Sequence, residues 1–221
     1  MKPRLSQNHS AAMTLFEVGV VIAVVMILAV LFLPRLLAPK HHGSYINCIN
    51  NLKQVSLCFR IWEGDNGDIN PMGVSVTLGG AREMVATGGV TQVFQVMSNE
   101  LSTPKILLCP EDSTRRWATN FAGLSNSNIS YFVGVDVTNE LNPNLILSGD
   151  NHFELKGFPV KAGLCSFWTN DPVAWTRDRH GGPKYFGNLA FADGSVQTVY
   201  SANLRHFFEA TGLATNLFAL P

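Results

Sequence analysis

The sequence of 221 residues has little charge and no excess of either sign. Lys and Arg together number 16, Asp and Glu together number 16, and charged residues make up only 14% of the chain. Proteins that hold nucleic acid through its phosphates need clustered Lys and Arg to neutralise them. We therefore expect no nucleic acid among the partners of this protein.

The sequence also lacks the spacings that mark common metal and catalytic centres. No Cys-x-x-Cys pair occurs, which argues against both a zinc site and thioredoxin-type redox chemistry. Neither a phosphate-binding loop nor a nucleophile paired with a base can be recognised. The oxygen-rich segment DNGDIN, residues 65–70, lacks the spacing and the terminal Glu of an EF-hand, so calcium stays only a weak alternative. We expect a protein without catalytic residues, metal or cofactor.

What the sequence does contain is one long apolar run near its start. Residues 18–33 carry no charge, and apolar neighbours extend the run to residues 15–37, interrupted by Glu17, Pro34 and Arg35. A helix over residues 15–37 would be roughly 34 Å long at ~1.5 Å per residue, and the hydrocarbon core of a bilayer is about 30 Å thick. A secretory signal would carry its cleavage site after the run, and the following PRLLAPKHH offers none. The pattern predicts a transmembrane helix.

A short polar leader, MKPRLSQNHSAA, precedes the run. The segment AAMTLFEVGVVIAVVMILAVLFLP resembles the N-terminal cleavage and methylation motif of type IV prepilins and type II secretion pseudopilins. The resemblance implies that a prepilin peptidase cuts between Ala12 and Met13 on the cytoplasmic side of the membrane and then methylates the new N-terminus at Met13. Ala12 departs from the Gly that is most frequent in the family, and Met13 departs from its Phe.

Two further residues match the family by position. Counted from Met13, Glu17 is the fifth residue and Pro34 the twenty-second, where the family has its Glu and many members have a Pro. A carboxylate inside a bilayer costs about 2.5–3.5 kcal/mol on insertion scales. The resemblance implies that Glu17 pairs with the N-terminus of a neighbouring subunit; the alternative is that it reaches water at the interface. Pro34 would bend the helix as it leaves the membrane, or end the span.

A second helix is predicted over YINCINNLKQVSLCFRIWEGD, because apolar residues recur there every three or four positions from Ile46 to Trp62. Its CINNLKQ resembles a large pseudopilin-like bacterial family whose C-terminal signature is a His, nine residues and then Asp-Gly. The resemblance implies an α+β, pilin-like fold, in which one long helix, transmembrane in its first half and amphipathic in its second, packs on a small antiparallel sheet. We expect a leader (1–12), a transmembrane helix (13–37), its amphipathic continuation (38–64) and a globular domain (65–221).

Short motifs along the globular part resemble landmarks of the same family. The signature itself is represented by His180 and by Asp193-Gly194, but twelve residues instead of nine separate them, which puts a direct His–Asp contact in doubt. We expect His180 to hydrogen-bond its loop to the neighbouring hairpin and not to bind metal. The remaining landmarks are LCPED at 108–112, SY at 130–131 and LSGDN at 147–151.

Asp193-Gly194 has its own local explanation. The strand-like runs NLAFA and SVQTVY flank this pair, and Asp-Gly is a favoured pair for a two-residue type I′ hairpin turn. Such a turn would place Leu189 and Phe191 on one face of the sheet with Val196, Thr198 and Tyr200.

The four cysteines, Cys48, Cys58, Cys109 and Cys165, all follow the apolar run and are candidates for a disulfide. Cys48 and Cys58 would lie about 15 Å apart along one helix, too far for a bond that needs Cα atoms within about 7 Å. Either of them bonded to Cys109 or Cys165 would clamp the sheet domain to the helix. Free buried thiols are the alternative.

The function that these features favour is structural. The resemblance implies a non-enzymatic subunit of the bacterial inner membrane, with a cytoplasmic N-terminus and a periplasmic domain. Its partners would be the prepilin peptidase and other pilin-like subunits, in a type II secretion or type IV pilus-like filament. The alternative is a membrane-anchored extracytoplasmic binding protein that uses the same leader and binds a ligand with the aromatic loops around Phe167, Trp168 and Trp175. An enzyme using His180 and Asp193 is the least favoured class.

Overall fold

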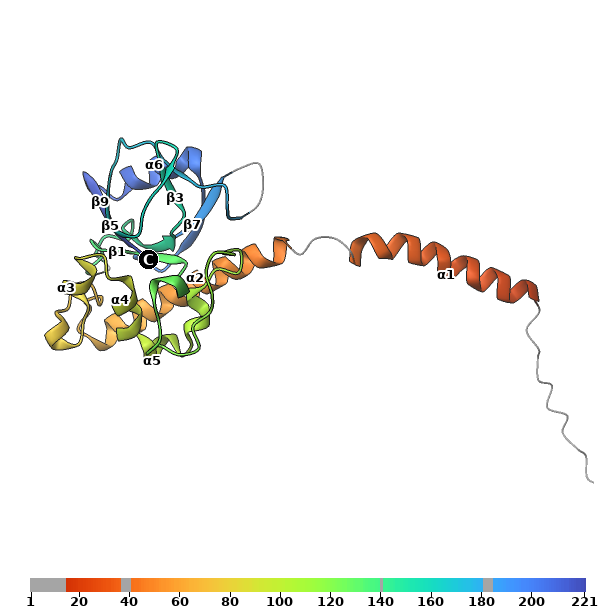
Figure 1. Cartoon of the computed structure of the whole chain (residues 1–221), viewed down its shortest axis with the longest axis horizontal. Helices are drawn as coiled ribbons and strands as arrows, with labels where there is room; N and C mark the ends of the chain where they lie inside the picture. Colours follow the sequence, from red (N-terminus) through yellow and green to blue (C-terminus); the bar gives the residue numbers. More distant parts are fainter. Residues whose placement is uncertain (1–14, 37–40, 140, 181–184) are drawn as a thin grey trace, which may run out of the picture. The chain divides into compact units, whose positions relative to one another are not determined.

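The computed structural model describes residues 15–36, 41–139, 141–180 and 185–221 (Figure 1). The chain divides into two compact units, Met1–Lys40 and His41–Pro221. The expected leader, and with it the processing site at Ala12 and Met13, lies outside the described residues.

The described part of the first unit is a single helix, α1 (Leu15–Leu36). Its stretch Leu15–Leu33 is long and apolar enough to cross a membrane, and none of it is buried within the structure. These properties are compatible with the expected single-pass membrane anchor. The helix continues through Pro34 to Leu36, so this proline does not end it at the preceding residue.

The second unit begins with α2 (His41–Asp65), which covers the predicted amphipathic helix. Most of the expected apolar stripe is buried against the sheet, whereas Ile46, near the start of the helix, is 54% exposed. The buried side chains of the stripe are those of Leu52, Val55, Phe59 and Trp62, and Ile49 is half-buried; Cys48, which the predicted stripe did not include, is buried as well.

The expected antiparallel sheet is present, and the domain is α+β. Six strands form the large sheet in the order β5-β9-β1-β2-β7-β8, and three form a small sheet in the order β4-β3-β6, with antiparallel pairing throughout. The strands are β1 (Tyr131–Gly134), β2 (Ile146–Asp150), β3 (Phe153–Leu155), β4 (Phe158–Pro159), β5 (Gly163–Trp168), β6 (Val173–Trp175), β7 (Phe186–Phe191), β8 (Val196–Tyr200) and β9 (Thr215–Leu220).

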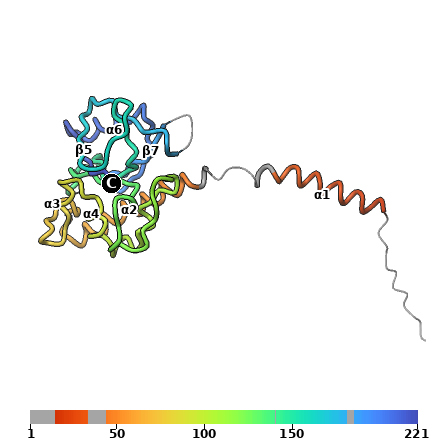
Figure 2. The backbone as a smooth tube through the Cα atoms, viewed as in Figure 1, coloured from red at the N-terminus to blue at the C-terminus, as the bar shows by residue number. Residues whose placement is uncertain are grey.

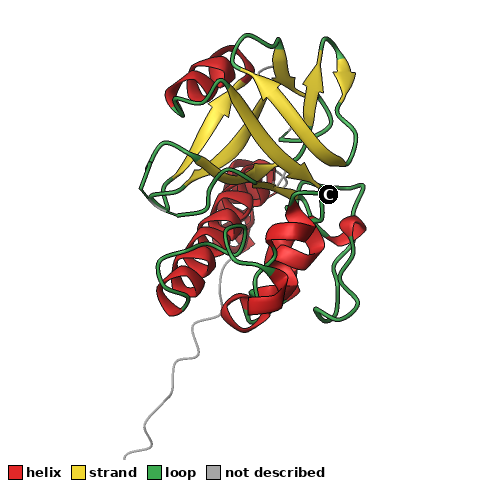
Figure 3. Ribbon diagram, turned by 90° about the vertical axis from the view of Figure 1, so that its left-hand side faces the viewer, coloured by secondary structure: helices red, strands yellow, loops and turns green. Residues whose placement is uncertain are grey.

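Helices cover both faces of the large sheet (Figure 3). One face packs against α2 and the short helices α4 and α5, and the other packs against α6 and the small sheet. The remaining helical segments are α3 (Arg82–Val85), α4 (Val90–Val96), α5 (Ser98–Leu101), α6 (Ser201–Ala210), η1 (Val76–Leu78), η2 (Pro104–Leu107) and η3 (Asn126–Asn128).

The alternation of side chains along a strand divides the interior into two cores. In β1, Tyr131 and Val133 belong to the core beside α2, whereas Phe132 belongs to the core beside α6. The second core is rich in aromatic rings, and Phe153 stacks on Trp175 there with ring centroids 4.6 Å apart. Because both faces are buried, all four residues of β1 are buried.

The β7–β8 hairpin is confirmed, but its predicted turn is wrong. Gly194 has a φ of 82°, whereas Asp193 is not among the residues with positive φ, so the turn is not type I′. Phe191 N donates to Ser195 O, and Gly194 N donates to Phe191 O, which makes a three-residue loop of residues 192–194 with glycine in the left-handed position.

The extra loop residue changes the strand pairing by one position. Leu189 pairs with Gln197, and Ala190 pairs with Val196. A shift of one residue exchanges the two faces of a strand. Leu189 and Phe191 therefore share their core with Val199, and the predicted partners Val196, Thr198 and Tyr200 point to the opposite face.

Candidate functional site

The covalent link between α2 and the sheet domain is a disulfide of Cys48 and Cys109, whose Cα atoms are 4.9 Å apart. One of the expected pairings between a helix cysteine and the domain is thus present. Cys58 and Cys165 are free thiols. Burial and the nearby Glu100 raise the pKa of the Cys58 thiol to about 11, and burial raises the pKa of Cys165, so neither forms a reactive thiolate readily.

Short motifs that lie far apart in the sequence converge beside this disulfide. Asp112, from LCPED, lies 2.6 Å from Arg179, the residue before His180, and both side chains are buried. Ser130 Oγ donates to the same carboxylate over 2.8 Å, and Thr114 donates to it through its N–H and its hydroxyl. Burial alone would raise the pKa of Asp112, but Arg179 and the two hydroxyl donors outweigh it and hold the pKa below its usual value.

Arg179 joins Asp112 to a third motif. Its Nη1 donates to Asn151 Oδ1 over 2.6 Å, and Asn151 belongs to LSGDN. Arg115 contacts the same carboxylate: its Nη1 lies 3.3 Å from Asp112 Oδ2, and its Nη2 donates to the main-chain oxygen of Pro221 over 2.9 Å. The chain trace reaches that residue between the sheet and the helical layer (Figure 2).

His180 takes part in the same buried network. Its Nδ1 donates to Phe186 O over 3.3 Å and lies 3.8 Å from Asp150 Oδ2, and its Nε2 lies 3.4 Å from Cys109 Sγ. Asp150 Oδ2 also accepts from the main-chain and side-chain N–H groups of Asn188, at 2.7 and 2.9 Å. Since Phe186 is the first residue of β7, His180 links its loop to the hairpin as expected.

His180 and Asp193, which resemble the two halves of the family signature, have different contacts. Asp193 sits in the hairpin turn, where its Oδ1 accepts from Ser195 N and its main-chain oxygen accepts from Arg60. The carboxylate nearest to His180 is that of Asp150 instead. The signature residues therefore contribute to structure at two separate places, the turn and the buried network.

Among the described residues, one group has His, Cys or carboxylate atoms close enough to hold a metal ion: Cys48, Cys109 and His180. Two of these three ligands are consumed by the disulfide, because metal binding requires thiolates. In the weak calcium candidate, residues 65–70, Asn66 and Asp68 donate their N–H groups to Glu63 O and end α2, and Asn70 N bonds Thr138 O. This segment acts as a helix-terminating turn.

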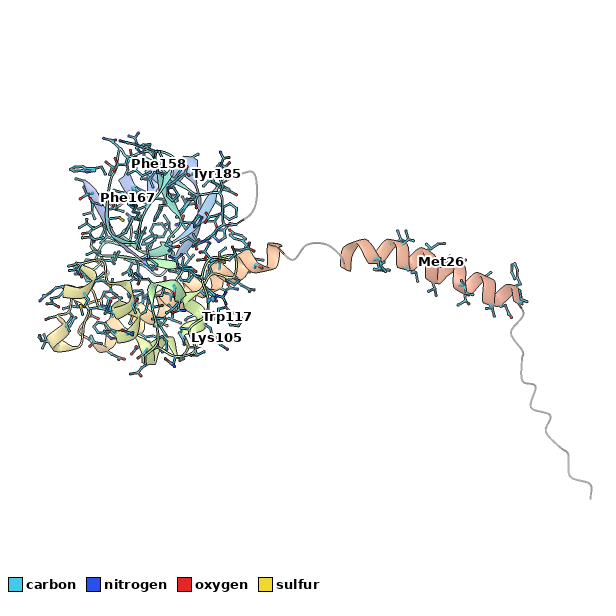
Figure 4. All side chains as sticks on the ribbon, viewed as in Figure 1. Met26, Lys105, Trp117, Phe158, Phe167 and Tyr185 are labelled. Atoms are coloured by element: carbon cyan, nitrogen blue, oxygen red, sulfur yellow. A yellow bond between two sulfur atoms is a disulfide. The ribbon has the colours of Figure 1, made fainter. Side chains whose placement is uncertain are left out.

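The aromatic residues expected to form a binding surface divide between interior and exterior. Phe167 and Trp175 are buried in the core beside α6, and Trp168 is 60% exposed. A different aromatic, Trp117, is 68% exposed, and Lys105 Nζ lies 6.0 Å from its ring centroid (Figure 4). The four residues do not form one shared platform.

A pocket of about 250 Å³ opens beside the buried network. Its polar lining includes Asn151 from LSGDN, Arg115 close to LCPED, and Arg179 directly before His180. The sequence analysis did not predict a site at this place. The lining residues are Thr114, Arg115, Asn151, His152, Phe153, Pro159, Val160, Ala162, Thr176, Asp178, Arg179, Leu220 and Pro221.

Sequence reasoning missed Arg115, His152 and Asn188 as members of this region. His152 directly follows the LSGDN motif, and Arg115 lies three residues after Asp112, so their proximity to short polar motifs was the available signal. Comparison of the chain with protein-family models, with curated proteins and with solved structures gave no match.

Proposed function

We propose that this chain is a non-enzymatic, pilin-like subunit. A prepilin peptidase removes residues 1–12 and methylates Met13, α1 anchors the product in the bacterial inner membrane, and subunits assemble into a type II secretion or type IV pilus-like filament. The observation that carries the proposal is α1 itself, an apolar helix with none of its membrane-length stretch buried and with Glu17 in its first turn.

Glu17 is the residue that favours assembly over simple anchoring. An anchor needs apolar surface alone, and a carboxylate in the apolar part of a bilayer costs about 2.5–3.5 kcal/mol. A positively charged N-terminus at Met13 of a neighbouring subunit would offset this cost by pairing with the carboxylate. Assembly through α1 would therefore explain why a carboxylate is present at this position of the apolar helix.

The disulfide supports the proposed topology. Disulfides persist in the periplasm and outside the cell, and they are rare in the cytoplasm, where thiols are kept reduced. A domain that is closed by Cys48 and Cys109 therefore fits the extracytoplasmic side of the membrane. The N-terminus before α1 would then face the cytoplasm.

The outer face of α2 offers a surface for neighbouring subunits. Leu57 is 57% exposed and Ile61 is 46% exposed, on the side opposite the buried stripe. These two residues are one helical turn apart and form an exposed apolar pair, whereas Asn50 and Lys53 separate them from Ile46 on the same face. Packing of helices side by side would bury this pair.

Two measurements test the proposal. Co-expression with a prepilin peptidase, followed by intact mass determination, should show loss of residues 1–12 and one added methyl group. An uncut chain would make a plain signal anchor the better assignment. In cells that carry the assembly machinery, Glu17→Ala should abolish cross-linking between single cysteines introduced into α1 while leaving cleavage intact; unchanged cross-linking would contradict the role of Glu17. Leu28→Ala is the matched control within the same helix.

A further inference from the structure

The imidazole of His180 lies directly against the disulfide that closes the domain. Its Nε2 is 3.4 Å from Cys109 Sγ, which is hydrogen-bonding distance for the large sulfur atom, and both residues are buried. The sulfur of Cys48 completes the group, since the three side chains have atoms within 4.8 Å of one another. A ring nitrogen in this position can exchange a proton with the sulfur of Cys109.

The second nitrogen of the ring determines where the hydrogen of a neutral imidazole lies. His180 Nδ1 is 3.3 Å from Phe186 O and 3.8 Å from Asp150 Oδ2. Both oxygens only accept, so Nδ1 carries the hydrogen and Nε2 presents its lone pair to Cys109 Sγ. A disulfide sulfur has no hydrogen to donate, whereas the thiol of reduced Cys109 has one. The contact therefore becomes a hydrogen bond when Cys109 is a thiol.

Asp150 adds a third group behind the ring. Its side chain is fully buried, and Asn188 holds it through a main-chain and a side-chain N–H at 2.7 and 2.9 Å. A carboxylate at this distance would stabilise the imidazolium that forms when His180 takes a proton. Thiol, imidazole and carboxylate in this order form the arrangement that activates cysteine nucleophiles. The sulfur that lies within reach of an activated Cys109 is that of Cys48.

The activating groups and Cys48 come from different parts of the domain. Cys109, Asp150 and His180 all follow α2 in the sequence, and the polar contacts that align them involve no residue of α2. Cys48 instead lies on α2 and is fully buried once the helix has packed. An oxidant therefore reacts with Cys48 before α2 packs, and the closing step itself needs no external molecule to enter the interior.

We propose that His180 is the general base that closes the disulfide of this domain. A disulfide oxidant first forms a mixed disulfide with Cys48. The thiol of Cys109 then gives its proton to His180 Nε2, and the thiolate attacks Cys48 Sγ. The bond between Cys109 and Cys48 forms as the bond between Cys48 and the oxidant breaks, and the oxidant leaves as a thiolate that takes up the proton. This inference does not depend on filament assembly, because the disulfide closes a single domain.

The test follows two intermediates that differ in which cysteine attacks. The full chain, carrying Cys58→Ser and Cys165→Ala, is reduced in urea and diluted into detergent buffer with oxidised glutathione. Samples are quenched with acid, and peptide mapping follows the glutathione adducts of Cys48 and Cys109 separately. The adduct of Cys48 is closed by Cys109 with the help of His180, whereas the adduct of Cys109 is closed by Cys48, which the base does not activate.

The two adducts should close at different rates, and the difference should depend on pH. An ordinary thiol, with a pKa of about 8.5, is only about 3% ionised at pH 7 and roughly three-quarters ionised at pH 9. We therefore expect the Cys48 adduct to close at least about tenfold faster than the Cys109 adduct at pH 7, and less than about threefold faster at pH 9. Equal rates at pH 7 would overturn the proposal.

The groups around the ring do not account for such a pH dependence. The titratable groups that face it are Asp150 on β2, His152 beyond the end of β2 and Tyr45 on α2. The preceding residue, Arg179, is held in a buried ion pair. Asp, Arg and Tyr side chains ordinarily titrate outside the range from pH 7 to 9. Burial lowers the pKa of His152 to about 3, so its ring is neutral throughout.

Variants assign the effect to His180. His180→Asn removes the base, and Asn tolerates the φ of 53° at this position. The difference between the two adducts should then disappear at pH 7. His152→Phe is the matched control, because it replaces a second buried histidine whose ring centroid is 5.4 Å from that of His180, and it should leave the difference intact. A difference that survives in His180→Asn, or slowing by the same factor at pH 7 and 9, would show a structural role instead. The comparison of adducts in the chain with His180 tests the proposal even if His180→Asn does not fold.

Discussion

The guanidinium of Arg179 and the carboxylate of Asp112 meet in the interior 2.6 Å apart, although each comes from a separate short motif. Each group has a further hydrogen-bond partner, Ser130 for Asp112 and Asn151 for Arg179, so both charges are compensated within the interior. Removing one member of a buried ion pair typically costs 3–5 kcal/mol, because the remaining charge is left without compensation.

We therefore expect Asp112→Asn to lower the free energy of unfolding by about 3–5 kcal/mol. Urea unfolding followed by circular dichroism would measure the loss. The control is Glu83→Gln, which removes an exposed carboxylate that also lies 3.0 Å from an arginine, Arg82, and should lower stability far less. Similar losses for both variants would contradict the importance of burial.

A second prediction concerns pH. The pKa of His152 is lowered to about 3 in the folded protein and is ordinarily 6.5, so the unfolded chain binds a proton between these values and the folded chain does not. Stability contributed by the neutral ring is complete above pH 6.5 and is lost as the pH falls toward 3, with a slope of up to about 1.4 kcal/mol per pH unit. His152→Phe should flatten the profile in this range.

Urea titrations at several pH values would test this expectation. His206→Phe should leave the slope as it is, because His206 is exposed. An unchanged profile in His152→Phe would show that other groups dominate acid sensitivity in this range.

The disulfide gives a third prediction. Cys48 and Cys109 are 61 residues apart in sequence, and closing a loop of that length restricts the unfolded chain by about 4 kcal/mol in the loop-entropy view. Cys48→Ala, or reduction of the wild type, should lower stability by about 2–5 kcal/mol.

Peptide mapping without reductant should recover Cys48 joined to Cys109. Cys165→Ala should change stability little, because this cysteine is a half-buried free thiol. A linked peptide containing Cys58 or Cys165 would contradict the pairing.

The hairpin turn gives a fourth prediction. Gly194 has a φ of 82°, and a Cβ added there would lie 3.2 Å from the Arg60 side chain. Gly194→Ala should cost about 1–2 kcal/mol, because the left-handed region is unfavourable for residues with a Cβ. Gly194→Asn should cost less, since Asn tolerates this conformation. Equal losses in thermal unfolding would mean that the Arg60 contact, and not the backbone, limits the position.

Local patterns predicted these helices well, because the helical period of apolar residues depends only on residues that are close together in the sequence. Within the described residues, the run 15–37 corresponds to α1 and the stripe from Ile46 to Trp62 corresponds to α2. The predicted register of β7 and β8 was wrong by one residue, because the same Asp-Gly pair occurs in both two-residue and three-residue hairpin loops. Only the hydrogen bonds of Phe191 distinguish these loops.

The buried network could be predicted only as a set of unconnected motifs. Asp112, Asn151 and Arg179 were each part of a marked segment or directly beside one, but no spacing rule brings them together. Their contact depends on the order of strands in the sheet, which places the ends of β1, β2 and β7 side by side. That order is a property of the whole chain, so neither the ion pair nor the pocket has a local sequence signal.

The position of the disulfide also determines how mechanical tension would travel through an anchored subunit. A force applied to the N-terminal end of α2 reaches Cys48 before most of the helix, and the disulfide transmits this force directly to Cys109. Residues 49–108, which include α3, α4 and α5, then lie in a side branch outside the path of the force. The helical layer would keep its packing under extension, while the segments after Cys109 carry the strain.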